Sequence, residues 1–185
     1  MLPNGIQLYK FKKQKKIDGD YIIYTGSYLY KPNKDAIDYL NTYIMPKLIK
    51  KMPNLNLVLT GGGFKKKYPW VIDKGIVSKS DLYNFLFFSK CLCVPLKFGS
   101  GTRIKIIEAL SLGTIVISSK KGIEGINLKK TNPPFITDGD KNFINKILNV
   151  IKNNKKFKSK SKNLKKFYVE NYSMKNILKK FINEN

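Results

Sequence analysis

The sequence predicts an α/β fold, a doubly wound parallel sheet covered by helices. Strand-like segments that are almost continuously apolar alternate along the chain with segments whose apolar residues recur at helical spacing. Glycine loops follow four of the expected strands, at residues 26, 61–63, 99–101 and 122–125. In such sheets ligands bind beyond the carboxyl ends of the strands. We therefore expect the four loops to line a binding edge.

The first half of the chain contains apolar runs bounded by turn residues, and these predict strands at 21–28, 55–60, 70–74 and 91–96. Two stretches of helical periodicity lie between them, at 33–51 and 81–89. Pro46 is expected to kink the end of the first helix, because proline lacks the N–H that a helix interior needs. Ser80 is the expected N-cap of the second helix.

The second half continues the alternation of strands and helices. Strands are expected at 114–118 and 134–137, and helices at 141–153 and 174–183. The lysine-rich stretch 152–166 is expected to be a solvated, partly helical connection. For the whole chain we expect a linker at 1–20 with a turn at Pro3–Gly5, a domain at 21–156, and a basic connection with a closing helix at 157–185.

The helix expected after the strand 91–96 begins with the wrong charge. Thr102 is its N-cap candidate, and Ile104, Ile107 and Leu110 form its apolar stripe. Arg103 and Lys105 then fall in the first turn, where the helix dipole already leaves partial positive charge, at a cost of a few tenths to about 1 kcal/mol each.

Two interpretations explain this charge. In the first, an anion is held by free backbone N–H groups, the helix dipole and both side chains. In the second, the loop is an ordinary glycine turn, and Lys105 forms a surface pair with Glu108 three residues further on. The neighbouring glycine loops favour the anion site.

Composition limits the chemistry that the chain can use. With 185 residues it suits one domain with a short appendage. Histidine is absent, which removes the commonest general base and metal ligand. Cys91 and Cys93 point to the same face of a strand and are too few for a zinc site, so we expect buried thiols in a reducing compartment.

The formal net charge of +24 would favour nucleic acid, anionic lipid or phosphorylated ligands. Lysine, asparagine and isoleucine are frequent throughout the chain, so a generally basic surface is the simpler interpretation. No run of about 18 apolar residues and no signal-peptide pattern is present. We expect a cytoplasmic protein, and a peripheral contact with an anionic inner membrane face stays open.

Several motifs between residues 21 and 150 together resemble a known family. They are Y-T-G-S-Y, K-P-N-K-D-A-I, L-V-L-T-G-G-G, D-K-G-I-V and G-S-G-T-R-I-K-I-I-E-A-L-S-L-G-T-I-V-I. This order resembles the C-terminal, nucleotide-sugar-binding half of GT-B glycosyltransferases of group 1 (GT4-like). The resemblance implies a Rossmann-like domain that forms one half of a GT-B architecture, in a transferase of polysaccharide biosynthesis.

The resemblance also implies roles for the basic helix start. Arg103 and Lys105, with the loop amides of Ser100, Gly101 and Thr102, would hold the donor diphosphate. Glu108 is similar to the second acid of the family's E-x7-E motif, whose carboxylate binds ribose. The first acid of that motif would fall at Ser100, so the usual contact to the sugar is missing.

Four further residues match weaker parts of the family pattern. Ile76 and Val77 correspond to the turn that contacts the base, Gly26 faces the phosphates, and Glu124 follows the fifth strand as a weaker candidate. The resemblance implies a metal-free scheme with no cofactor and a nucleotide-diphosphate sugar as donor substrate. Charge that builds on the departing diphosphate would be met by fixed cations and a helix N-terminus.

Members of this family also have an acceptor-binding N-terminal half, and none of the motifs above corresponds to it. We therefore expect nucleotide-sugar binding without efficient transfer to a glycan or lipid-linked acceptor, unless an acceptor-binding domain or subunit is supplied. A non-catalytic nucleotide-sugar-binding or regulatory module is the alternative. A nucleic-acid binder that works through residues 152–166, with Phe157 and Phe167 stacking on bases, lacks any recognition motif, so no specific nucleic acid is expected.

Overall fold

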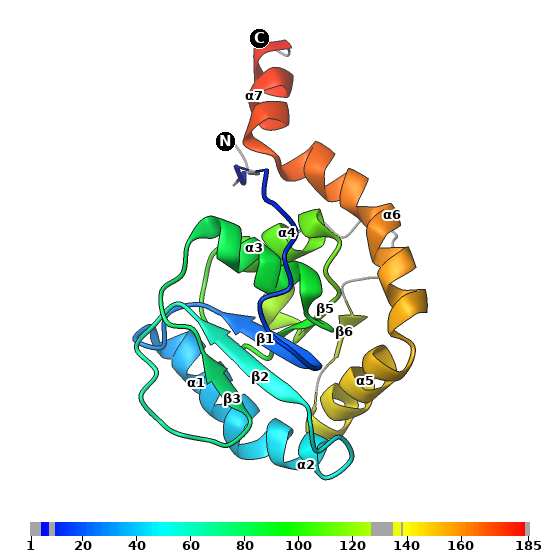
Figure 1. Ribbon diagram of the computed structural model, residues 1–185. Helices are drawn as coiled ribbons and strands as arrows, with labels where there is room; N and C mark the ends of the chain where they lie inside the picture. The colour runs from blue at the N-terminus through cyan, green and yellow to red at the C-terminus, as the bar shows by residue number, and fades with distance from the viewer. Residues whose placement is uncertain (1–4, 8–9, 127–134, 138, 184–185) are drawn as a thin grey trace.

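Six parallel strands form one sheet at the centre of the protein (Figure 1). The structure is a computed structural model that describes residues 5–7, 10–126, 135–137 and 139–183. The strands are β1 (Tyr21–Thr25), β2 (Asn56–Thr60), β3 (Val71–Asp73), β4 (Leu92–Val94), β5 (Val116–Ser118) and β6 (Phe135–Ile136). Their order is β3-β2-β1-β4-β5-β6. The order reverses between β1 and β4, which confirms the predicted doubly wound sheet.

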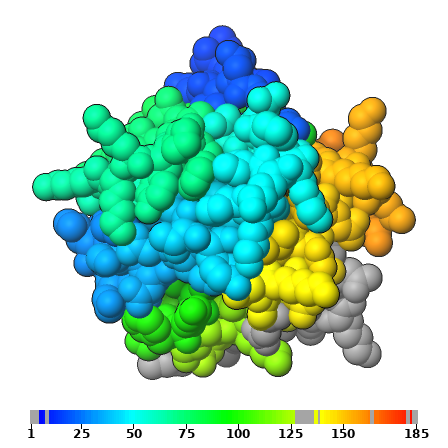
Figure 2. Space-filling model, turned by 90° about the horizontal axis from the view of Figure 1, so that it is seen from below, coloured from blue at the N-terminus to red at the C-terminus, as the bar shows by residue number. Residues whose placement is uncertain are grey.

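Helices cover both faces of the sheet. One face carries α1 (Lys31–Tyr39), α2 (Met45–Ile49) and α5 (Asp140–Lys152), and the other carries α3 (Lys79–Phe88) and α4 (Ile104–Leu112). Figure 2 looks onto the first face, where α1 and α2 (blue to cyan) lie beside α5 (yellow). α6 (Asn154–Tyr172) packs along α4, and α7 (Met174–Asn183) extends away from the sheet.

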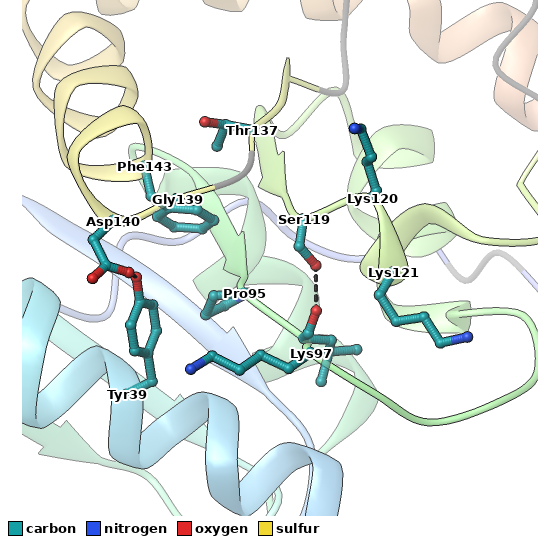
Figure 3. A pocket seen from close by; sticks show the side chains of 11 residues that line it. Tyr39, Pro95, Lys97, Ser119, Lys120, Lys121, Thr137, Gly139, Asp140 and Phe143 are labelled. Carbon is teal, nitrogen blue, oxygen red and sulfur yellow. Dashed lines mark hydrogen bonds between the residues drawn. The ribbon is translucent and has the colours of Figure 1, made fainter.

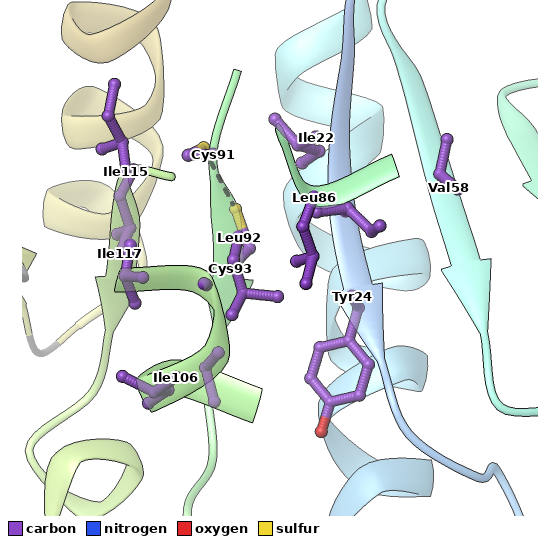
Figure 4. Close-up of a cluster of buried hydrophobic side chains, with 14 of the residues drawn as sticks. Ile22, Tyr24, Val58, Leu86, Cys91, Leu92, Cys93, Ile106, Ile115 and Ile117 are labelled. Atoms are coloured by element: carbon purple, nitrogen blue, oxygen red, sulfur yellow. Dashed lines mark hydrogen bonds between the residues drawn. The ribbon is translucent and has the colours of Figure 1, made fainter. Parts of the chain in front are cut away.

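The core lies on both sides of β1 and β4, and every residue of these two strands is buried. Figure 4 shows Ile22 of β1, Leu92 of β4 and Ile106 of α4 in this cluster. This double burial explains why the strands read as continuous apolar runs. Cys91 and Cys93 are buried free thiols with their Sγ atoms 3.7 Å apart, as the sequence predicted.

The first predicted helix is less regular than its periodicity suggested. It begins at Lys31, and a π-helical stretch (Leu40–Ile44) separates α1 from α2. Pro46 follows that stretch and has no N–H to donate, while the N–H of Met45 bonds to the carbonyl of Leu40, five residues back. The π-helical stretch therefore precedes Pro46, and the predicted kink at Pro46 stays a prediction. The preceding strand ends at Thr25, earlier than the predicted residue 28.

The predicted N-cap of the second helix is wrong. Ser78 caps α3, because its backbone is extended and its hydroxyl accepts a hydrogen bond from the N–H of Asp81 at 3.1 Å. Ser80 lies inside the first turn. The helix therefore starts at Lys79, two residues earlier than expected.

The lysine-rich stretch 152–166 is a packed helix rather than a partly helical connection. Residues 154–172 form the single helix α6, and Ser161 and Tyr168 on its inner face are fully buried. The Ser161 hydroxyl donates to the carbonyl of Thr114, 3.2 Å away, at the end of α4. The many charged residues of this stretch obscured the spacing of its inward-facing residues in the sequence. The last helix spans 174–183, as predicted.

The described part of the N-terminal segment is held at the junction of α6 and α7. The N–H of Ile6 donates to the carbonyl of Tyr172 at 2.7 Å, and the carbonyl of Ile6 accepts from Met174 at 2.9 Å. Pro3 and Asn4 of the predicted turn, and Pro134 at the start of a predicted strand, lie outside the described residues. Among the described helices, none is long and apolar enough to span a bilayer.

Candidate functional site

The loops that follow β1 and β2 are tied together at the carboxyl edge of the sheet. The N–H of Gly26 donates to the carbonyl of Thr60 at 2.8 Å, and that of Tyr28 donates to Gly62 at 3.0 Å. A Cβ on Gly61 would lie 2.4 Å from the backbone of Gly26, so the two loops approach each other more closely than a side chain allows. The β1–α1 loop is therefore fixed beside the point where the strand order reverses.

An open hollow of about 440 Å³ lies at this edge. It is lined by Thr25, Gly26, Thr60, Gly61, Ile76, Val77, Leu82 and Lys105. Four of these were candidate site residues from the sequence: Gly26, Ile76, Val77 and Lys105. The Ile76 side chain is 88% exposed, so it is free to contact a ligand.

The start of α4 differs from the prediction. Arg103, and not Thr102, occupies the N-cap position, and no side chain caps the helix. Ile104 is 48% exposed, whereas Ile107 and Leu110 are buried. The expected apolar stripe is therefore wrong at Ile104, because this first helical residue lies at the rim, beyond the part of α4 that packs on the sheet.

The Arg103 side chain is buried and has no acidic partner among the described residues. Its Nη1 donates to the carbonyl of Ser100 in the same loop, while Nε and Nη2 are buried without a hydrogen-bond partner. A buried polar group left unpaired costs about 1–3 kcal/mol, and more when it is charged. The loop therefore holds unsatisfied donors of the kind that an anion would accept from.

Lys105 turns inward to two neutral partners. Its Nζ donates to Oδ1 of Asn33 at 2.9 Å and to the hydroxyl of Tyr24 at 3.1 Å, and lies 4.2 Å from the Tyr24 ring centroid. Burial of the ammonium, and then the nearby Arg103 guanidinium, lower the pKa of Lys105 to about 7. The alternative surface pair between Lys105 and Glu108 is therefore wrong.

Glu108 lies one turn further along α4 and is nearly buried, with 8% of its side chain exposed. Its carboxylate contacts the ammonium of Lys79, the first residue of α3. Lys79 also stands at the unfavourable end of a helix, and Glu108 offsets its charge. The carboxylate thus links α3 to α4.

The remaining predicted residues lie on the rim. Ser100 and Gly101 are exposed in the β4–α4 loop, and Thr102 is half-buried next to Gly125, where a Cβ would lie 3.5 Å from the Thr102 hydroxyl. Glu124 is exposed and pairs with Lys121 at 2.6 Å, and it does not line the hollow.

A family model described as glycosyl transferases group 1 matches residues 19–153. The chain belongs to this family. An uncharacterized 44.6 kDa protein in the cps region of Klebsiella pneumoniae is 26% identical over 200 residues, which cover all of this chain and 51% of that protein.

Solved structures show the same fold. Sucrose-phosphate synthase from Thermosynechococcus elongatus matches 99% of this chain and 51% of its own, with a TM-score of 0.76 and 15% identity. Anabaena Alr3699/HepE, in complex with UDP and glucose, matches 89% of this chain and 48% of its own, with a TM-score of 0.69 and 14% identity. This group 1 chain therefore spans about half the length of these proteins and has the fold of one half of a GT-B enzyme.

A second hollow of about 420 Å³ lies at the same edge of this glycosyltransferase domain, beyond β4 and β5 (Figure 3). Tyr39 of α1 contacts the carboxylate of Asp140 at the start of α5, and the Lys97 ammonium lies 5.0 Å from the Tyr39 ring centroid. The Ser119 hydroxyl donates to the carbonyl of Leu96 at 2.5 Å. None of the candidate residues from the sequence lines this hollow.

Sequence reasoning missed Tyr24, Asn33 and Lys79. Tyr24 lies in a buried strand, and a buried tyrosine hydroxyl needs a partner, which is the one signal that pointed to it. For Asn33, only its polar side chain close to the start of an expected helix was visible. Lys79 lay outside the helix expected at 81–89, so no signal in the sequence pointed to it.

Proposed function

We propose that this group 1 domain binds a nucleotide-diphosphate sugar in the crevice between the β1–α1 and β4–α4 loops. Arg103, Lys105 and the amides of residues 100–102 would hold the diphosphate. The observation that carries the proposal is the pair of desolvated cations at the start of α4, neither of which forms an ion pair within the described residues. A helix N-terminus with two such cations is suited to a polyanion.

The other candidate residues take roles around this anchor. Ile76 and Val77 would contact the base, Gly26 would let the phosphates approach the backbone, and Glu108 would bind ribose. Glu124 takes a peripheral role, because it already pairs with Lys121. Residues 21–156 carry the site in this proposal, and the flanking segments 1–20 and 157–185 meet at Ile6 and Ser173.

The reaction that fits this site is sugar transfer with the nucleoside diphosphate as leaving group. Negative charge grows on the diphosphate as the glycosidic bond breaks. Arg103, Lys105 and the start of α4 would stabilise that charge at fixed positions, without a metal ion. The loss of one such donor lowers turnover by about 100- to 1,000-fold in characterised enzymes.

An acceptor site would come from a second half or subunit, since the relatives are about twice as long as this chain. We propose that the isolated chain binds donor but transfers sugar inefficiently. The cps-region relative favours a glycan or lipid-linked acceptor in polysaccharide biosynthesis. The complex of Anabaena HepE with UDP makes uridine nucleotides the first donors to test.

A thermal-shift screen with UDP, GDP, ADP and their sugars tests the binding step. A bound ligand raises the melting temperature in proportion to RT ln(1 + [L]/Kd). We expect one nucleoside diphosphate to stabilise the wild type and not Arg103→Ala, while Lys97→Ala at the second hollow keeps the full shift. The absence of any shift for the wild type, or an equal shift for Arg103→Ala, would contradict the proposal.

Ser100 favours a second candidate, a nucleotide-sugar-binding module without catalysis, because it stands where the family has its first acid. Mixing the chain with an acceptor half from a relative separates the two candidates. Restored transfer supports the enzyme, and binding without transfer in every combination supports the module.

A further inference from the structure

Asn33 occupies the third position of α1, and its side chain contacts Lys105 in the first turn of α4. It is a polar residue with only 8% of its surface exposed. A buried amide is stable only when its oxygen and nitrogen both find partners. The partners of Asn33 therefore indicate what it holds in place.

The Asn33 amide joins three parts of the site. Its Oδ1 accepts hydrogen bonds from Nζ of Lys105 at 2.9 Å and from the hydroxyl of Tyr24 at 2.8 Å. Its Nδ2 donates to the carbonyl of Ser27 at 2.9 Å. One side chain thus connects β1, the β1–α1 loop and the ammonium that α4 contributes to the hollow.

The backbone around this contact leaves no spare room. A Cβ on Gly26 would lie 2.7 Å from Nδ2 of Asn33 and 2.8 Å from Nζ of Lys105. Both polar groups therefore pack directly against the backbone of Gly26. A long side chain with four rotatable bonds, such as that of Lys105, is fixed in one direction only by contacts of this kind.

We propose that Asn33 is a positioning residue that aims the ammonium of Lys105 at the diphosphate bound in the hollow. This inference rests on the proposed function. A neutral amide suits the role because it orients the ammonium and leaves its charge free for the ligand. A carboxylate at the same place would pair with Lys105 and compete with the diphosphate.

A double-mutant cycle on UDP affinity tests the inference, with calorimetric titration of the wild type, Asn33→Ala, Lys105→Ala and the double variant. If Asn33 acts through Lys105, Asn33→Ala weakens UDP binding by about tenfold in the wild type and by less than about twofold in the Lys105→Ala background. A full effect in both backgrounds would overturn the inference. UDP is replaced by the diphosphate that stabilises the wild type most, if that is another one.

Asn41→Ala is the matched control, because Asn41 is also a buried asparagine on the same helical run. Its amide bonds to the carbonyl of Ile37 and to the indole of Trp70, away from the hollow. Both variants should lower the melting temperature, and only Asn33→Ala should weaken UDP binding. Equal losses of affinity would reduce Asn33 to a structural role and overturn the inference.

A measurement without ligand separates this inference from the proposed function. The pH dependence of acetic anhydride labelling at Lys105, read by mass spectrometry, reports the pKa of that ammonium. In Asn33→Asp the midpoint should rise by at least about one unit, because the new carboxylate stabilises the charged form. An unchanged midpoint would overturn the contact between Asn33 and Lys105, even where UDP binds. A raised midpoint in a protein that binds no diphosphate would uphold the positioning and refute the proposed function alone.

Discussion

The ammonium of Lys79 contacts the carboxylate of Glu108, and this contact leaves Lys105 without the acidic neighbour that helix spacing would have given it. Lys105 turns instead to Asn33 and Tyr24, which orient its charge without cancelling it. Charge at the start of α3 is balanced, while charge at the start of α4 is not. This asymmetry supports the proposal that the start of α4 binds an anion.

The stability of the wild type should depend on pH through Lys105. Its pKa of about 7 lies below the ordinary value of 10.5, so the unfolded chain binds more protons than the folded one between these two values. This contribution to the free energy of unfolding therefore rises with pH across that window and is least favourable below pH 7. Lys105→Met should be stabilised relative to wild type at pH 6, with an advantage that shrinks by pH 9. Denaturant titrations at the two pH values measure the difference, and a difference independent of pH would contradict the burial of this ammonium.

Binding of UDP near pH 8 should take up a proton. At that pH most of the Lys105 side chains are neutral in the free protein, and a diphosphate next to Nζ raises the pKa again. Calorimetry in two buffers that differ in ionisation enthalpy measures the uptake, which should approach one proton for the wild type and fall near zero for Lys105→Met. Affinity should also decrease as the pH rises above 7. Zero uptake by the wild type would place the ligand away from Lys105.

Gly26→Ala should damage the site more than Gly19→Ala does. Both glycines have positive φ, 135° and 77°, so each substitution strains the backbone by about 1 kcal/mol or more. Only at Gly26 would the new methyl collide with Asn33 and Lys105, since nothing lies within 4 Å of a Cβ on Gly19. We expect Gly26→Ala to lose UDP binding and Gly19→Ala to keep most of it, by calorimetry on folded protein. Equal affinities of the two variants would speak against the packed contact.

Glu108 should govern the preference for ribose. Glu108→Gln keeps the shape of the side chain and removes the charge that pairs with Lys79. We expect the ratio of affinities for UDP and 2′-deoxy-UDP to fall by about tenfold, because a hydrogen bond to a charged group is worth about 1.5–3 kcal/mol. Glu124→Gln is the control and should leave the ratio unchanged, as Glu124 forms a surface pair with Lys121. An unchanged ratio of affinities in Glu108→Gln would mean that Glu108 contributes only to packing.

The sheet could be predicted from the sequence because burial on both faces gives the central strands continuous apolar runs. Residues 21–25 and 92–94 show this directly, and their order with the helices fixes the doubly wound class. The charge anomaly at Arg103 and Lys105 was visible for a similar reason. Two cations in a first helical turn are unfavourable, and this can be recognised from the sequence without knowing the fold.

The partners of these charges could not be predicted, because they come from residues distant in sequence. Asn33 lies 72 positions before Lys105, and Lys79 lies 29 positions before Glu108. Helix starts were also misplaced, at Ser78 and at Arg103, since several neighbouring residues could act as caps and tertiary packing selects among them. The inner face of α6 was hidden for the same reason, because only the surface of α4 makes Ser161 a core residue.

A crystal structure of the chain soaked with UDP would show where the diphosphate binds. We expect the diphosphate in the first hollow, with its oxygens within hydrogen-bond distance of Arg103 and of Lys105 Nζ. A diphosphate bound elsewhere, such as beside Lys97 in the second hollow, with Arg103 still turned onto the carbonyl of Ser100, would contradict this expectation.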